Sequence, residues 1–104
     1  MRVRRARFSE LIDRQLDLFE QEQRGLIDDS IAAEKAYNRA DRDEAEERYG
    51  DYVDLVETGT ELLAELRDNY ASTLAVENAA EYEHAFNRAV RKRLPRLALE
   101  IEDT

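Results

Sequence analysis

The chain has 104 residues, the size of one small domain with a single core. Its composition of 39% charged residues, 3 glycines, 1 proline and no cysteine favours helices and excludes disulfide scaffolds, zinc knuckles and thiol nucleophiles. The formal net charge of −9 argues against nucleic acid as a partner, because phosphate is repelled by an acidic surface. No stretch approaches the ~20 apolar residues that span a bilayer. We therefore expect one cytoplasmic domain over residues 1–104.

The charge is distributed unevenly along the chain. Residues 1–7 carry four arginines and no acid, residues 9–83 carry 22 acids and 7 bases, and residues 84–99 carry five bases and no acid. Arginine outnumbers lysine 14 to 2. An acidic, arginine-rich chain results either from codon bias in a GC-rich genome or from adaptation to high salt, and the sequence is compatible with both.

The spacing of apolar residues predicts a first helix over residues 9–38. Ser9 is a candidate N-cap. After it, apolar and small side chains recur at alternating steps of four and three, the heptad-like seam of a packed helix. The seam is weakest at Gln23 and Ser30, and Gly25 costs about 1 kcal/mol in a helix interior. Because the seam keeps its phase through Gly25, we predict one long helix.

A second helix is predicted over residues 42–72. Asp41 and Glu44 have the spacing of a capping box, and apolar residues then recur at steps of three and four from Tyr49 onward. The apolar arc is wide, so this helix should touch two neighbours. Gly59 lies within the seam, where a missing side chain lets another helix approach closely.

A third, shorter helix is predicted over residues 76–94, ending before Pro95. The residues that follow, which include Leu97, Leu99 and Ile101, form either an extended tail or a last helical turn. Long helices joined by short turns pack antiparallel. The predicted fold is therefore all-α, an antiparallel three-helix bundle of two long helices and a shorter third that proline interrupts near the C-terminus.

The third helix carries a compact basic cluster. In an antiparallel register it should lie beside acids of the second helix, which favours internal charge pairs over a contact to phosphate or to an anionic partner. The register predicts Arg88 near Glu61, Arg91 and Arg93 near Glu57, and Arg96 near Asp54, with Lys92 completing the cluster.

The single histidine follows a glutamate by three residues, in the run Ala80-Glu81-Tyr82-Glu83-His84-Ala85. Glu81 and His84 thus share one helical face, with the Glu-x-x-His spacing of di-iron helical bundles. The run is similar to the ligand motif of ferritin-like proteins, including the short encapsulated ferritins. This resemblance implies a metal-binding helical oligomer that holds iron or another transition metal. Because no acid interrupts the apolar seams, we favour the alternative, a solvent-edge histidine in a protein without a cofactor.

The sequence offers little for catalysis, and we expect no enzymatic activity. It has three serines, no glycine-rich phosphate loop and no Ser, His and acid arrangement. The apolar arcs of the first two helices are wider than one short helix can cover. We therefore predict a non-enzymatic interaction module that forms a homodimer or binds another protein. The residues expected at its interface are Leu11, Leu18, Tyr49, Tyr52, Leu55 and Leu62.

Overall fold

The computed structural model describes residues 7–98, and this part of the chain is all-α, as predicted. Residues 1–6 of the basic N-terminus, and Leu99 and Ile101 of the expected tail, lie outside the described residues. The described elements are α1 (Ser9–Glu22), α2 (Arg24–Arg39), α3 (Ala45–Ala71), α4 (Val76–Arg93) and the 3₁₀ helix η1 (Pro95–Ala98).

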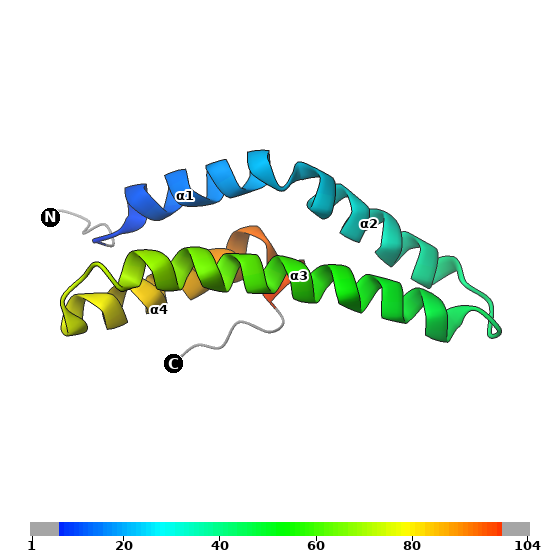
Figure 1. Ribbon diagram of the computed structural model, residues 1–104. Helices are drawn as coiled ribbons and strands as arrows, with labels where there is room; N and C mark the ends of the chain where they lie inside the picture. Colours follow the sequence, from blue (N-terminus) through cyan, green and yellow to red (C-terminus); the bar gives the residue numbers. More distant parts are fainter. Residues whose placement is uncertain (1–6, 99–104) are drawn as a thin grey trace, which may run out of the picture.

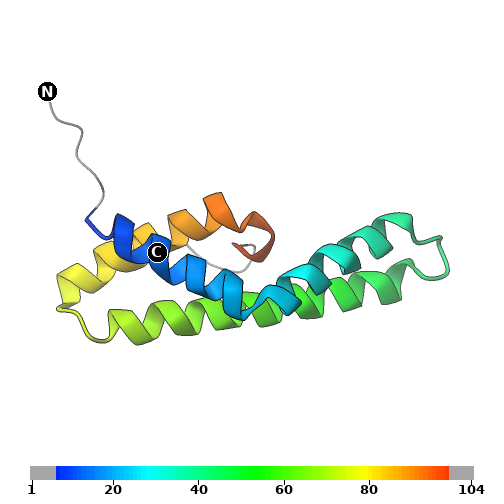
Figure 2. The same cartoon turned by 90° about the horizontal axis from the view of Figure 1, so that it is seen from above.

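The molecule is elongated, with extents of 55 × 30 × 24 Å. Its radius of gyration is 16.0 Å, against about 13 Å for a compact chain of this length. The long helix α3 runs through the whole structure, with α2 along its first half and α4 beside its second half (Figure 1). Viewed from above, α1 lies over the line between α3 and α4 (Figure 2).

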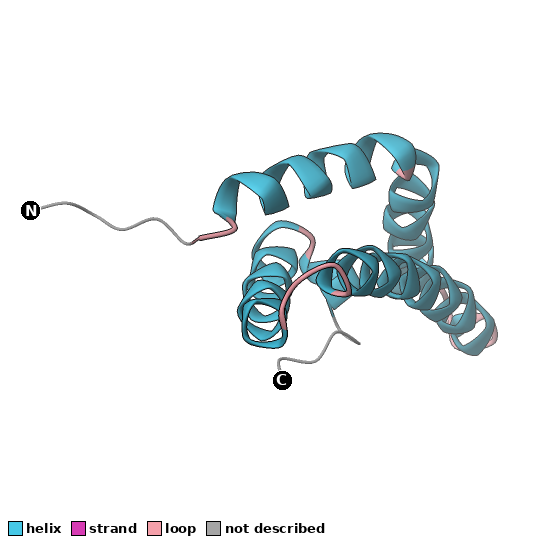
Figure 3. Cartoon of the chain, turned by 60° about the vertical axis from the view of Figure 1, so that its left-hand side comes forward, coloured by secondary structure: helices cyan, strands magenta, loops and turns pink. Residues whose placement is uncertain are grey.

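The prediction of one unbroken first helix is wrong, and with it the count of three helices. At Gln23 the backbone turns to φ −109° and ψ 27°, and α1 and α2 meet there at an angle (Figure 1). The break falls where the apolar seam is weak and two residues before Gly25, so little helical stability is lost. The bend lets α1 cross onto α4 while α2 stays along α3 (Figure 3).

The other helix limits agree closely with the sequence pattern, but the predicted caps do not form. Ser9 lies inside α1, with Phe8 at the N-cap position, and neither α1 nor α3 has a side-chain cap hydrogen bond. Asp41 and Glu44 form a turn in which the Glu44 N–H donates to the Asp41 carbonyl at 3.1 Å, so α3 begins at Ala45. After Pro95 the chain makes one more helical turn, η1.

The core lies where α1, α3, α4 and η1 meet. An aromatic cluster fills its N-terminal end, with the Tyr82 ring 4.8 Å from Tyr70, 5.4 Å from Phe8 and 5.8 Å from Phe86 between centroids. By contrast, Ser30 is the one residue of α2 that is fully buried. The far half of the α2–α3 hairpin is therefore a two-helix arm with a thin interior.

The seam glycine of α3 has the role expected from the sequence. A Cβ at Gly59 would lie 2.9 Å from Cδ2 of Leu97, so the missing side chain makes room for η1. The neighbouring Thr60 hydroxyl donates to the Leu97 carbonyl at 2.6 Å. Together these contacts hold η1 against the middle of α3.

Candidate functional site

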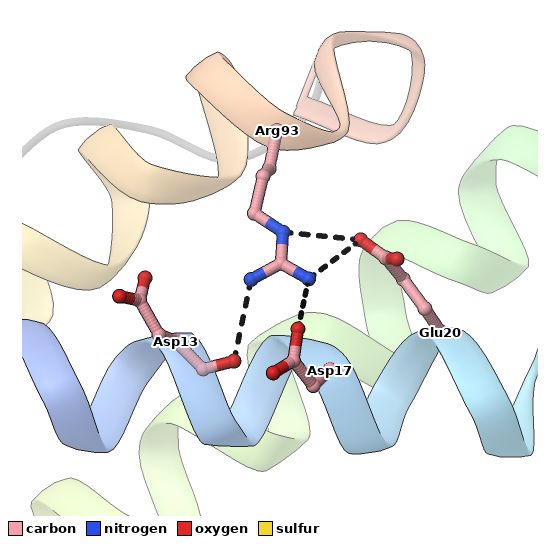
Figure 4. A network of polar contacts seen from close by, with 4 residues as sticks. All are labelled: Asp13, Asp17, Glu20 and Arg93. Carbon is pink, nitrogen blue, oxygen red and sulfur yellow. Dashed lines mark hydrogen bonds and ion pairs between the residues drawn. The ribbon is translucent and has the colours of Figure 1, made fainter.

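Polar contacts join α4 to both α1 and α3: Arg67 of α3 donates to Asn87 Oδ1 at 2.9 Å, and Arg93 at the end of α4 binds α1. Arg93 donates from Nε to Glu20 Oε2 at 3.1 Å, from one terminal nitrogen to the Asp13 carbonyl at 3.2 Å, and from the other to Asp17 at 2.5 Å (Figure 4). Partial burial lowers the pKa of the Arg93 guanidinium. The hydrogen bond to Asp17 and the charges of Glu20 and Asp17 outweigh that effect and raise the pKa above its ordinary value.

The prediction that the arginines of the basic cluster pair with acids of α3 is therefore wrong, because Arg93 binds acids of α1 instead. Arg96 binds Glu34 of α2 through Nε at 3.2 Å and a terminal nitrogen at 2.5 Å. Arg93 and Arg96 turn toward α1 and α2 because the break at Gln23 brings those helices beside the end of α4. Four exposed acids of α3 consequently have no ion pair with any residue in 7–98; they are Asp54, Glu57, Glu61 and Glu65.

A groove with a volume of 250 Å³ runs between α1 and α3. Leu18 and Phe19 form its α1 wall, and Leu62 and Leu66 form its α3 wall. Leu18 is 53% exposed although it is a large apolar side chain. The remaining lining residues are polar or acidic, and no base lines the groove: Gln15, Glu22, Gln23, Glu65 and Asn69.

A second groove, of 290 Å³, lies on the other side of α1, against α4. Its apolar floor consists of Ile12 and two alanines, and its rim carries Asp13, Arg88 and Lys92. The small alanine side chains and the mixed charges give this groove less apolar surface for a partner than Leu18, Leu62 and Leu66 provide in the α1–α3 groove.

The structure brings two of the six predicted interface residues together, since Leu18 and Leu62 line the α1–α3 groove. Leu11 and Tyr52 are half-buried against the core, and Leu55 is also half-buried. Tyr49 lies at the tip of the α2–α3 arm, where its ring centroid is 5.2 Å from that of Tyr37.

Seven residues that the sequence did not assign to the site also line the groove, among them Leu66, Glu22 and Glu65. Leu66 belongs to the apolar seam and could have been found from its spacing to Leu62. Glu22 and Glu65 carry no such signal, because acids are common throughout both helices.

Tyr82 is the most strongly perturbed titratable side chain among the described residues for which a value is resolved. It is fully buried, and its hydroxyl donates to Gln15 Oε1 at 2.8 Å. Burial raises the pKa of Tyr82 to about 12, although the hydrogen bond to Gln15 acts in the opposite direction. The hydrogen bond to Gln15 joins α4 to α1.

Glu81 and His84, the predicted metal ligands, are both exposed on α4. Glu81 lies 3.5 Å from the Arg7 guanidinium. Within residues 7–98, no three side chains of the metal-binding types gather into a group that could hold an ion. None of the helices described is both long and apolar enough to cross a bilayer.

Comparisons with protein-family models, curated proteins and solved structures give no match for this chain.

Proposed function

We propose that the protein is a small, non-catalytic helical module that binds a protein partner through the groove between α1 and α3. The observation that carries this proposal is the position of Leu18, which is 53% exposed beside Leu62 and Leu66. Fully burying one leucine side chain is worth about 1.5–3 kcal/mol. A partner that covers the groove therefore gains roughly half of this energy from the exposed part of Leu18.

The way α1 is held supports this assignment. It lies across α3 and α4 and is joined to α4 by Arg93 and by the Tyr82–Gln15 hydrogen bond. The α1 side chains that line the groove include Leu18 and Glu22, which take no part in these contacts with α4. A partner in the groove would pack on both α1 and α3.

The test combines solution mass with site-specific crosslinking. Light scattering of the wild type and of Leu18→Glu over a range of concentrations measures self-association. A photoreactive amino acid at position 18, expressed in the cells that make the protein, measures binding of another partner. The same amino acid at Glu57, an exposed α3 position that does not line the groove, is the control.

Two results would support the proposal: a mass above 12.2 kDa that Leu18→Glu returns to the monomer, or a crosslinked product formed at position 18 and not at position 57. A 12.2 kDa monomer at all concentrations, with no product specific to position 18, would contradict it.

A further inference from the structure

We infer that the α1–α3 groove accepts a basic amphipathic helix from a partner protein, rather than a second copy of this chain. The inference rests on the proposed function, because it names the partner of the same groove. The inference is based on the charge of the residues that line the groove, on the length of the groove, and on the way the basic C-terminal end of α4 packs on α1.

The charged residues that line the groove are both acidic. Glu22 on the α1 wall and Glu65 on the α3 wall flank the apolar side chains, and no lining residue is basic. On α3 the acids continue beyond the groove at Glu61, Glu57 and Asp54, which lie on one side of the helix because residues three and four apart are neighbours. None of these five acids has an ion pair within residues 7–98.

This charge distribution disfavours a symmetric dimer through the groove. In a twofold interface the same surface patch lies on both subunits. The carboxylates at Glu22 and Glu65 would then face the same two carboxylates of the second copy, and like charges at an interface suppress association. A partner whose lysines or arginines flank an apolar row places opposite charges at the same positions.

The shape of the groove is suited to a helix. Its walls span Gln15 to Gln23 on α1 and Leu62 to Asn69 on α3, or about 12 Å of helix at 1.5 Å per residue. That length matches two to three turns of a docked helix, whose apolar residues recur at three- and four-residue spacing. Both walls are helices whose backbone groups are bonded internally, so they offer no edge for an added β-strand.

The protein contains an internal example of the same arrangement. The basic C-terminal end of α4 packs against α1, and Arg93 binds Asp17 and Glu20 there. A partner helix in the α1–α3 groove would pack on the other side of α1 in a similar way, with its bases near Glu22 and Glu65.

The experiment uses the full chain and a fluorescent amphipathic peptide of about 18 residues. The peptide carries leucines at helical spacing, flanked by lysines, and a matched peptide has glutamate in place of each lysine. We expect the lysine peptide to bind more tightly and its affinity to fall as NaCl is raised. Leu18→Glu should weaken binding at least about tenfold, through loss of the apolar contact. Glu22→Gln with Glu65→Gln should weaken it about fivefold, through loss of two rim charges.

The matched control is Glu46→Gln, which removes the same charge from an exposed position in the first turn of α3, far along the helix from the groove. Glu46→Gln should leave the affinity within about twofold of the wild type. Circular dichroism of each variant checks that the helices remain.

Different outcomes separate the inference from the proposed function. If the lysine peptide binds but Leu18→Glu has no effect, binding is a general charge effect and the inference is wrong. If neither peptide binds while the wild type self-associates through Leu18, the inference is wrong and the proposed function stands. If neither peptide binds, the protein is a monomer and position 18 forms no crosslink, both fail.

Discussion

Replacing Arg93 with methionine should detach α1 from α4 before the rest of the molecule unfolds. Arg93 makes hydrogen bonds to the Asp13 carbonyl and to the carboxylates of Asp17 and Glu20 (Figure 4). Methionine keeps an unbranched apolar stem of similar reach, so the substitution removes the charge and the donors with little loss of packing.

The expected loss can be worked out from the exposure of each partner. A hydrogen bond to a charged group is worth about 1.5–3 kcal/mol when it is well buried, whereas an exposed ion pair contributes about 0.2–1 kcal/mol. The Asp17 side chain is 61% exposed, so its contribution belongs to the lower range. Arg93 and Glu20 are 30% and 32% exposed, which places their contact between the two ranges. A total of about 2 kcal/mol follows, or roughly a 30-fold change in an opening equilibrium.

Hydrogen exchange of the backbone amides is the assay, because it reports opening of each helix separately. In Arg93→Met, the amides of α1 should exchange about 30-fold faster than in the wild type, while those in the middle of α3 should change less. Arg88→Met is the control, since Arg88 lies on the same helix, is exposed and has no ion pair with a described residue. Equal acceleration in α1 and α3, or none in either, would refute the assignment of Arg93 as the contact that holds α1.

Three further predictions concern the stability of the fold. Gly25→Ala, in open space within α2, should raise the free energy of unfolding in urea by about 1 kcal/mol. Gly59→Ala should not, because its Cβ would lie 2.9 Å from Leu97 Cδ2; an equal gain in both variants would contradict that contact. Thr60→Val should cost about 1–2 kcal/mol in the same titration, by leaving the Leu97 carbonyl without its 2.6 Å hydrogen bond. Burial raises the pKa of Tyr82 to about 12. The contribution of the neutral Tyr82 side chain to the free energy of unfolding is therefore complete below about pH 10 and is lost as the pH rises towards 12. The wild type should therefore lose up to about 2.7 kcal/mol relative to Tyr82→Phe over that interval, and parallel pH curves for the two proteins would be the opposing result.

The helical class and most helix limits could be predicted because they depend on local periodicity. The α4 range, the helical stop before Pro95 and the close approach at Gly59 all follow from residues near one another in sequence. The break at Gln23 could not be decided in that way. A weak seam position and a nearby glycine lower the cost of a bend, but whether the helix bends depends on the contacts that α1 gains with α4, which are remote in sequence.

The candidate site also depends on contacts between residues that are remote in sequence. Leu18 and Leu62 were expected at an interface because each widens an apolar arc. That they share one groove depends on how α1 crosses α3, and the periodicity of neither helix contains that information. Leu66 could have been included from its spacing to Leu62. Glu22 and Glu65 could not, because nothing in the sequence distinguishes them from the many other acids of these helices.

The error in the predicted charge pairs has a direct consequence for function. A straight three-helix bundle would have placed Arg88, Arg91 and Arg93 beside α3, and its acids would have been neutralised within the fold. The bend at Gln23 instead gives Arg93 to α1 and Arg96 to α2. The α3 acids therefore remain facing solvent beside an apolar groove, where repulsion between like charges three and four residues apart costs a few tenths of a kcal/mol per pair. A basic helix that binds there would remove this repulsion at the same time as it buries Leu18. Apolar burial and charge neutralisation would thus act together, and the affinity should depend on salt through Glu22 and Glu65 but on Leu18 at every salt concentration.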